Sequence, residues 1–215
     1  MVGLSERAAV RKNGREARRS VVGADRTSRE AALVSHLTSV RALQSASVGV
    51  FVAHDGEPDL MPFVEMLWAR GQTVALPVLE DDPSDRTMYF RVWKQGDALV
   101  AGRYDIPIPP QALSQATDSR IAPDCLLVSL TAFDSLGNRM GRGAGFFDRY
   151  LATADCQIVG VGFETQRIEH VPIEDHDVAM PTMVTDLGVR YLFSRNQSES
   201  RRNCGVIRKD GSPCE

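Results

Sequence analysis

The chain has 215 residues, 43% of them apolar, and a formal net charge of −3 at pH 7. A single domain of this length buries about 70% of the surface of its unfolded chain, so we expect a core without disulfides or a structural metal. The charge gives no reason to expect nucleic-acid binding, and no apolar run approaches the roughly 20 residues that span a bilayer. The basic segment 1–19 lacks the apolar part of a secretory signal, and the four cysteines form no Cys-x-x-Cys pair. Composition therefore predicts a cytoplasmic protein with reduced thiols and no membrane partner.

The first half of the chain alternates between helical and strand patterns. Apolar residues at helical spacing predict a helix over 26–43, and an almost wholly apolar, β-branched run predicts a buried strand over 48–52. A proline in the first turn and Gly71 after the last turn indicate a second helix over 62–69. A second strand is expected over 73–76.

A small insertion is expected next. The short runs 87–93 and 98–100 are separated by turn residues, a spacing typical of a hairpin. The prolines of 106–110 exclude that segment from a sheet interior, because proline donates no hydrogen bond to the ladder. We expect it to cross the surface or to line the edge of a cleft.

The remaining pattern completes an α/β domain. Strands are predicted over 125–130 and 158–163, with a helix over 147–154 between them. Strands that alternate with helices predict a three-layer α/β sandwich with a mostly parallel central sheet and a small hairpin insertion. Residues 1–193 are expected to form this single domain, and the polar composition of 194–215 predicts a disordered tail.

The most informative segment covers 137–150 and reads Gly-Asn-Arg-Met-Gly-Arg-Gly-Ala-Gly-Phe-Phe-Asp-Arg-Tyr. Glycines let a backbone approach an anion, the first N–H groups of the following helix point at it, and arginine adds bidentate charge. The pattern thus predicts a phosphate site. The alternative is a mobile surface turn, but such a turn needs no apolar anchor like the pair Phe146-Phe147. The spacing matches neither the Walker nor the Rossmann phosphate loop.

This segment resembles the glycine-rich signature of the 5-formyltetrahydrofolate cyclo-ligase family, A-F-D-x-x-G-x-R-x-G-x-G-x-G-Y-Y-D-R. The residues in register are Ala132, Phe133, Asp134, Gly137, Arg139, Gly141, Gly143, Gly145, Asp148 and Arg149. Segments 162–166, 171–177 and 185–186 resemble the family's second block. Upstream, 51–57 and 75–78 resemble the segments that supply the folate pocket and the next strand. The resemblance covers residues 11–192.

The resemblance implies an ATP- and magnesium-dependent enzyme that converts 5-formyltetrahydrofolate to 5,10-methenyltetrahydrofolate and releases ADP and phosphate. Phosphorylation of the formyl oxygen would turn a poor electrophile into one with a good leaving group. Such a reaction needs phosphate clamps, magnesium and a pocket for the pterin more than it needs a protein nucleophile. The implied partners are 5-formyltetrahydrofolate and ATP, and we expect a monomer.

The resemblance also implies roles for individual residues. Arg139 and Arg142 would stabilise the developing phosphate charge, and Asp148 and Asp177 would serve magnesium as oxygen ligands. The implied ATP contacts are Arg11, Arg15, Arg139, Met140, Gly141, Arg142, Gly143, Ala144, Gly145, Phe146 and Phe147. The implied substrate contacts are Val52, Glu57, Arg142, Gly143, Ala144, Gly145 and Phe146. In a parallel sheet, Glu57, the glycine-rich loop and the segment after Phe163 should meet at the carboxyl ends of the strands.

Local chemistry alone leaves other interpretations open for the acidic residues. Asp148 could be an N-terminal helix charge, Asp177 a turn residue, Glu57 a solvated loop acid and Val52 a core residue.

The basic segment near the N-terminus is also open to two interpretations. Arg11 and Arg15 have the spacing of the family's lysine and arginine. Lys12 competes with Arg11, however, and Gly14 stands where the family prefers leucine. A solvated basic helix is the alternative.

Several positions depart from the family pattern. Phe146 and Phe147 replace a tyrosine pair, Ser129 stands at a usual proline, and Ile108 stands where many members carry glutamate. These departures keep open a diverged paralogue that binds folate, or uses ATP on another substrate, without cyclo-ligase turnover. A sugar-phosphate isomerase would need a general base for which the sequence shows no separate motif.

Overall fold

The structure, a computed structural model, describes residues 4–82, 84–110 and 120–192, so the tail predicted over 194–215 lies outside the described residues. The helices and strands, in chain order, are α1 (Leu4–Arg19), α2 (Gly23–Ser39), β1 (Ser47–Gly49), α3 (Met61–Ala69), β2 (Thr73–Leu79), β3 (Met88–Val92), β4 (Val100–Ala101), β5 (Pro107–Ile108), β6 (Arg120–Ile121), β7 (Cys125–Ser129), β8 (Ala132–Phe133), β9 (Arg139–Met140), α4 (Phe146–Leu151), β10 (Gln157–Val161), β11 (Thr182–Thr185) and β12 (Gly188–Tyr191). Short 3-10 helices cover Arg41–Gln44, Arg103–Asp105 and Glu164–Gln166.

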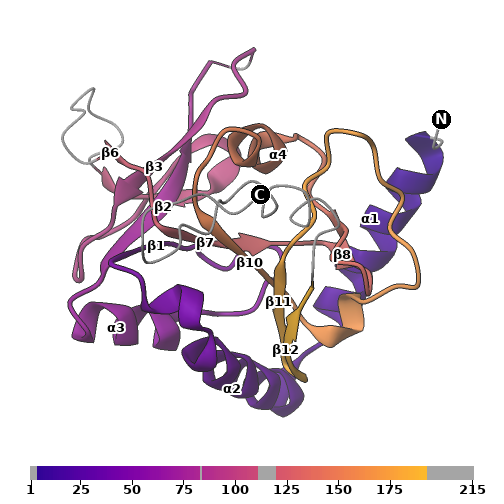
Figure 1. The fold of residues 1–215 in the computed structure, drawn as a ribbon, viewed down its shortest axis with the longest axis horizontal. Helices are drawn as coiled ribbons and strands as arrows, with labels where there is room; N and C mark the ends of the chain where they lie inside the picture. Colours follow the sequence, from indigo (N-terminus) through magenta and orange to yellow (C-terminus); the bar gives the residue numbers. More distant parts are fainter. Residues whose placement is uncertain (1–3, 83, 111–119, 193–215) are drawn as a thin grey trace, which may run out of the picture.

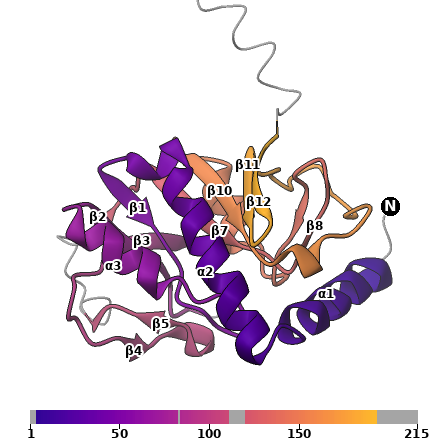
Figure 2. The same ribbon diagram turned by 90° about the horizontal axis from the view of Figure 1, so that it is seen from below.

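A mixed sheet separates two helical layers (Figures 1 and 2). Its strand order is β12-β11-β10-β7-β1-β2-β3-β6. The neighbours from β11 to β2 pair in parallel, whereas β12 at one edge and β3 and β6 at the other pair antiparallel. Helices α2 and α3 cover one face and α4 lies on the other. This arrangement confirms the predicted three-layer α/β sandwich with a mostly parallel sheet.

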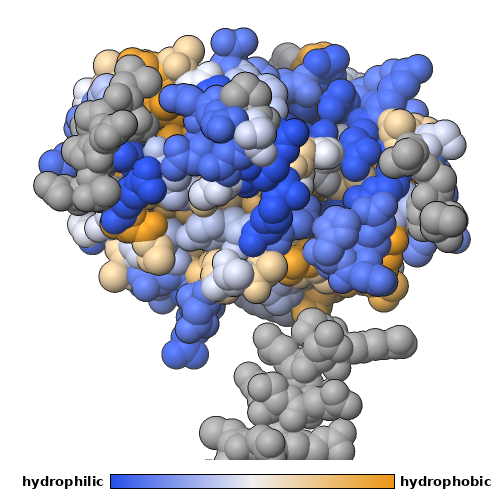
Figure 3. Space-filling model, turned by 90° about the horizontal axis from the view of Figure 1, so that it is seen from above, coloured by the Kyte–Doolittle hydropathy of each residue, from blue (hydrophilic) through white to orange (hydrophobic). Residues whose placement is uncertain are grey.

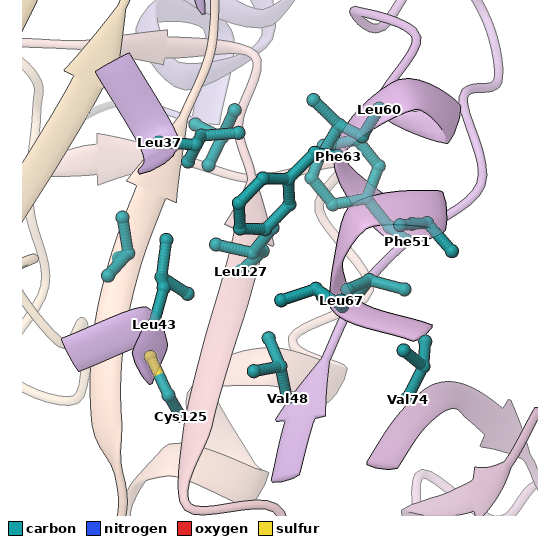
Figure 4. Packing of buried hydrophobic residues seen from close by; sticks show 14 of the residues in the cluster. Leu37, Leu43, Val48, Phe51, Leu60, Phe63, Leu67, Val74, Cys125 and Leu127 are labelled. Carbon is teal, nitrogen blue, oxygen red and sulfur yellow. The ribbon is translucent and has the colours of Figure 1, made fainter. Parts of the chain in front are cut away.

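The hydrophobic core lies on both faces of the sheet. On one face, Leu37 of α2 and Phe63 of α3 pack over Leu127 of β7 (Figure 4). On the other face, Phe146 and Leu151 of α4 belong to a second cluster with residues of β3 and β7. Burying a side chain of this size contributes about 1.5–3 kcal/mol, so these two clusters hold the three layers together.

The outer surface is more polar. Seen from the side on which α4 lies, hydrophobic residues form small patches that hydrophilic residues separate (Figure 3). Among the helices of the described residues, none is long and apolar enough to cross a membrane.

The hairpin insertion differs from its prediction in which strands pair. The run 87–93 contributes β3 to the main sheet, where it pairs with β2 and β6. The run 98–100 leads into β4, which pairs with β5 in a separate two-stranded ribbon. Pro107 therefore lies in a ribbon outside the main sheet, as expected for a residue that donates no ladder hydrogen bond.

The strand order reverses direction next to β1. The chain adds β2 on one side of β1 and adds β7, β10 and β11 on the other. Because β1 and β7 are parallel neighbours, their carboxyl ends lie at the same edge. Open α/β sheets bind ligands outside such a switch point. The segments that leave from this edge are 50–57 and 130–145.

Candidate active site

The glycine-rich loop is carried by a short hairpin. Strands β8 and β9 pair antiparallel, with Phe133 opposite Arg139. Gly143 has φ 102° and Gly145 has φ 69°, conformations in which a side chain is strained, so glycine is required at both positions. The buried Asp134 closes the hairpin by accepting hydrogen bonds from the N–H groups of Leu136 and Asn138, and it also accepts one from Val171. The loop thus has a defined shape next to the second sequence block.

Helix α1 forms a wall beside this loop. It contacts β8, β9 and the 3-10 helix Glu164–Gln166, and it lies next to β8 in both ribbon views (Figures 1 and 2). At Gly14 a Cβ would lie 2.3 Å from the backbone oxygen of Thr131, so only glycine allows this approach. The buried residues on this face of α1 are Arg7, Gly14 and Arg18, and they place two guanidinium groups inside the protein.

Two arginine–aspartate pairs lie near one another at one end of the loop. Arg7 donates to Asp177 Oδ2 at 2.7 Å and to the carbonyl oxygen of Pro172 at 3.0 Å. Arg139 donates to Asp148 Oδ1 at 2.6 Å. The hydrogen bond to Asp177 raises the pKa of Arg7 against the effect of burial, and the charge of Asp148 adds to this rise. Both aspartates therefore act on Arg7.

Burial alone would raise the pKa of Asp177, and it is the largest single influence on that carboxyl. Hydrogen bonds from Arg7 and from the backbone N–H of Glu174 nevertheless hold the pKa below its ordinary value. Asp177 is thus a partly buried carboxylate that stays ionised, rather than only a turn residue.

Positive charge is concentrated where α1 meets the glycine-rich loop. Arg11 Nε donates to the carbonyl oxygen of Gly141 at 3.3 Å, and a Cβ on Gly143 would lie 3.1 Å from the same nitrogen. Burial lowers the pKa of Arg11, and the neighbouring charges of Arg7 and Arg15 lower it further. An anion bound here would relieve this repulsion. Along the outer surface of α1, a hollow of about 370 Å³ is lined by Ala8, Arg11, Lys12, Arg15, Glu16 and Arg19.

Glu57 lies at the centre of a second charged cluster. Its side chain is only 3% exposed, which excludes a solvated loop acid. Oε1 accepts hydrogen bonds from Arg142 Nη2 at 2.9 Å and from Arg18 Nη1 at 3.4 Å, and Oε2 accepts one from the N–H of His54 at 3.1 Å. The ion pair between Arg142 and Glu57 joins the loop after β9 to the segment after β1. It therefore spans the switch point of the sheet.

The remaining apolar candidates pack against core residues. Val52 is half-buried against the larger cluster, and Met140 is fully buried against Ala132 and Val171. The ring of Phe146 packs in the second cluster and lies 5.5 Å from the guanidinium carbon of Arg103. Met140 can therefore offer a ligand its backbone more readily than its side chain.

The structure brings together most of the predicted site residues, and it places Arg7 and Arg15 of α1 beside different acidic residues. Arg15 Nε lies 3.9 Å from Asp55 Oδ2, on the Glu57 side, whereas Arg7 lies at the aspartates. Arg7 and Arg18 were missed by the sequence analysis. Arg7 could have been found, because Arg7 and Arg11 have the same four-residue spacing as Arg11 and Arg15. The apolar Val10 then stands before the second arginine, where the family prefers leucine.

The carboxylates of the site suit a magnesium ion that takes most of its ligands from water and substrate phosphates. Among the described residues, no three histidine, cysteine or acidic side chains form a group that could hold a metal by themselves. Magnesium is usually held by one or two carboxylates together with water and substrate phosphates. Asp148 and Asp177 supply two carboxylates beside a predicted phosphate loop, so they suit such an ion.

A larger hollow, of about 560 Å³, lies at the opposite edge of the sheet, where Gln157 begins β10 and Thr182 begins β11. It lacks the buried ion pairs of the carboxyl edge, so we place the candidate site at the carboxyl edge.

Known proteins resemble this chain in sequence and in fold. The sequence model of the 5-formyltetrahydrofolate cyclo-ligase family matches residues 4–186. The 5-formyltetrahydrofolate cyclo-ligase of Escherichia coli K12 is 36% identical over 143 residues, which cover 65% of this chain and 77% of that protein. The protein of the same name from Mycolicibacterium smegmatis is 33% identical over 171 residues, which cover 78% of this chain and 87% of that protein.

Two solved structures share the fold. The 5,10-methenyltetrahydrofolate synthetase of Aquifex aeolicus superposes with a TM-score of 0.73 at 24% identity, covering 87% of this chain and 93% of that one. The synthetase of the same name from Mycoplasma pneumoniae superposes with a TM-score of 0.63 at 18% identity, covering 84% of this chain and 98% of that one.

Proposed function

The chain belongs to the 5-formyltetrahydrofolate cyclo-ligase family, and we propose that it converts 5-formyltetrahydrofolate to 5,10-methenyltetrahydrofolate with ATP and magnesium. One observation carries the proposal beyond family membership. Arg142 of a glycine-rich loop donates to the buried carboxylate of Glu57 at 2.9 Å. The proposed phosphate loop and the proposed acceptor for pterin N–H groups thus touch each other, as transfer between the two ligands requires.

In the proposed reaction, the γ-phosphoryl group of ATP passes to the formyl oxygen and ADP leaves. Nitrogen 10 then attacks the formyl carbon and gives up its proton to water, and the carbon–oxygen bond breaks as phosphate departs. The backbone N–H groups of 141–145, with Arg139 and Arg142, would hold the phosphates and stabilise their charge. Met140, Ala144, Phe146 and Phe147 would complete the nucleotide contacts.

On the folate side, Glu57 would accept hydrogen bonds from the pterin, beside Val52. Gly143, Ala144, Gly145 and Phe146 would line the same pocket together with Arg142. On α1, we propose Arg7 and Arg11 as the pair at the nucleotide in place of Arg11 and Arg15. The contact of Arg11 with Gly141 and the burial of Arg7 beside Asp177 support this change.

Asp148 and Asp177 would hold the magnesium ion, directly or through water. When bound, the ion would neutralise part of the phosphate charge. Arg139 and Arg7 would keep both carboxylates in place.

The proposal also covers the oligomeric state, the location and the partners of the protein. We propose a monomer whose single domain covers residues 1–193, and which acts in the cytoplasm on small molecules without nucleic-acid or membrane partners. Among the described residues, Cys125 and Cys156 are free thiols.

A direct assay tests the proposal. Purified protein is incubated with 5-formyltetrahydrofolate and magnesium ATP, and the methenyl product is followed by its near-ultraviolet absorbance. We expect product only when ATP and magnesium are both present, with one ADP released per turnover. Tight folate binding without turnover at any enzyme concentration would favour the diverged folate-binding paralogue.

A further inference from the structure

Glu57 has two arginine partners on the same carboxylate oxygen, and the two differ in burial. Arg142 stands in the glycine-rich loop between Gly141 and Gly143, and its side chain is 36% exposed. Arg18 lies on the buried face of α1, and its side chain is 1% exposed. Changing conformation costs more free energy for a buried side chain than for a side chain on a glycine-flanked loop.

Arg18 is held by more than its contact with Glu57. Its Nη2 donates to Asp55 Oδ2 at 2.8 Å, and its Nη1 also lies 3.4 Å from the carbonyl oxygen of Leu130. The carbonyl of Leu130 comes directly after β7, and Asp55 and Glu57 follow β1. Arg18 thus joins both segments that leave the switch point to α1.

The function proposed above gives Arg142 a second task at the phosphates of ATP. If Arg142 were the single counter-charge of Glu57, moving it to the nucleotide would leave a buried carboxylate without a charged partner. An unpaired buried charge is costly, and it would favour protonation or rotation of the carboxylate. Either change would remove the hydrogen-bond acceptor that a pterin edge needs.

We propose that Arg18 is a positioning residue for folate, because it keeps Glu57 oriented and charge-balanced when Arg142 turns toward the nucleotide. Arg18 itself does not touch folate. Its effect passes through Glu57 and rests on the proposed function of that residue. Arg26 supports the same segment from α2 by donating to the carbonyl oxygens of Gly56 and Glu57 at 3.3 and 2.6 Å.

The experiment compares Arg18→Gln and Arg18→Lys with the wild-type enzyme. We expect Arg18→Gln to raise the KM for 5-formyltetrahydrofolate about tenfold or more, the loss expected when a buried carboxylate loses a charged hydrogen-bond donor. The KM for ATP should rise less than the folate KM, because Arg18 acts on Arg142 of the glycine-rich loop through the Glu57 oxygen that the two share, rather than at the nucleotide itself. Arg18→Lys keeps the charge and should recover part of the folate affinity.

The matched control is Arg19→Gln. Arg19 is the next residue of the same helix and also pairs with Asp55, but its side chain is 63% exposed. An exposed ion pair of this kind contributes little, so both KM values should stay within about twofold of wild type. Melting temperatures of all variants separate a loss of folding from a loss of positioning.

A double variant shows whether Arg18 acts through Glu57. In a Glu57→Gln background, adding Arg18→Gln should change the folate KM little further, because the carboxylate that Arg18 holds is already absent. Equal rises in both KM values, an unchanged folate KM, or full additivity with Glu57→Gln would each overturn the positioning role. Absence of turnover in the wild type contradicts the proposed function instead. Calorimetric folate affinities of wild type and Arg18→Gln then decide the positioning role separately.

Discussion

Asp148 and Asp177 are each paired with a buried arginine, and this pairing determines how their role can be tested. Arg139 and Arg7 have side chains that are 4% and 9% exposed. Replacing either aspartate by asparagine therefore removes the nearest counter-charge of a buried guanidinium, whether or not the carboxylate binds magnesium, although Arg7 keeps Glu174 Oε2 at 3.8 Å. Stability alone cannot separate a structural ion pair from a metal ligand.

We expect Asp148→Asn and Asp177→Asn to lower turnover steeply and to shift the magnesium requirement to higher concentration, because each removes one of the two proposed carboxylate ligands. Each should also cost about 1–3 kcal/mol of stability through the lost hydrogen bond. Magnesium titrations of initial rate and thermal melts measure the two effects. The exposed Asp175→Asn serves as the control. An unchanged magnesium dependence in either variant means that its aspartate is not a ligand.

Glu57→Gln should weaken folate binding while nucleotide binding stays almost intact. A neutral amide in place of a charged acceptor costs about 1–3 kcal/mol, which is roughly 5- to 150-fold in affinity. Arg142 also loses its partner and becomes available to phosphate, so nucleotide affinity should not fall. Calorimetric titration of each ligand decides this, and equal losses for both ligands would identify Glu57 as structural.

Individual site residues were predictable where chemistry and spacing agree. The glycines at 143 and 145 follow from the loop pattern, and the structure shows that both have positive φ. Arg18 was not predictable, because a buried arginine and an exposed one look alike in a basic segment. Its burial and its contact with Glu57 distinguish it from Arg19, which also pairs with Asp55.

At the scale of elements, α1 has an unusual buried face. Its inward positions are Arg7, Gly14 and Arg18, so a helix that the sequence presents as solvated and basic is docked by charged groups and by a close backbone approach. Helical periodicity alone misses such a helix, because the periodic residues are not apolar.

Gly14→Ala tests this docking. In an exposed helix interior, replacing glycine by alanine stabilises by about 1 kcal/mol. Here the new Cβ would meet the backbone oxygen of Thr131 at 2.3 Å, so we expect a loss of about 1–3 kcal/mol instead. Chemical denaturation measures the sign of the change in the free energy of unfolding. The exposed neighbour Asn13→Ala should be neutral or slightly stabilising, and a stabilised Gly14→Ala would show that α1 is not packed against β8.

At the scale of the whole molecule, lowered carboxyl pKa values make the fold sensitive to acid. Burial opposes the shift in Asp55 and Asp177, but hydrogen bonds and charges of neighbouring arginines lower both pKa values. A hydrogen bond from Ser47 lowers the pKa of Asp124. The unfolded chain therefore binds more protons than the folded one in acid. The resulting stability is present above about pH 4 and is lost as the pH falls through the lowered values.

We accordingly expect the melting temperature to be nearly constant from pH 7 to about pH 5 and to fall below about pH 4. Asp177→Asn, which removes one of the contributing groups, should show a shallower decline. Calorimetric scans across this range provide the measurement. A melting temperature that rises on acidification would contradict the ionised state of these carboxylates.

The alternation of strands and helices in the sequence predicted the overall architecture, but it did not predict which strands pair at the edges of the sheet. Strand β3 joins the main sheet beside β2, although its sequence predicted a hairpin with 98–100. Short edge strands have few residues to show a period, and their partners are set by packing with distant segments. The central strands were recognisable because burial on both faces leaves a continuous apolar run.

The Arg7–Asp177 pair joins residues that are 170 positions apart. During translation, α1 therefore leaves the ribosome long before the carboxylate that will neutralise its first buried arginine has been made. Its charged sequence suits this interval, because a basic helix can remain hydrated without offering an apolar surface to chaperones or to other nascent chains. The Arg7–Asp177 pair forms only when residues from both ends of the domain have been synthesised. Ligand binding would thus report on completion of the whole domain, rather than on formation of its core.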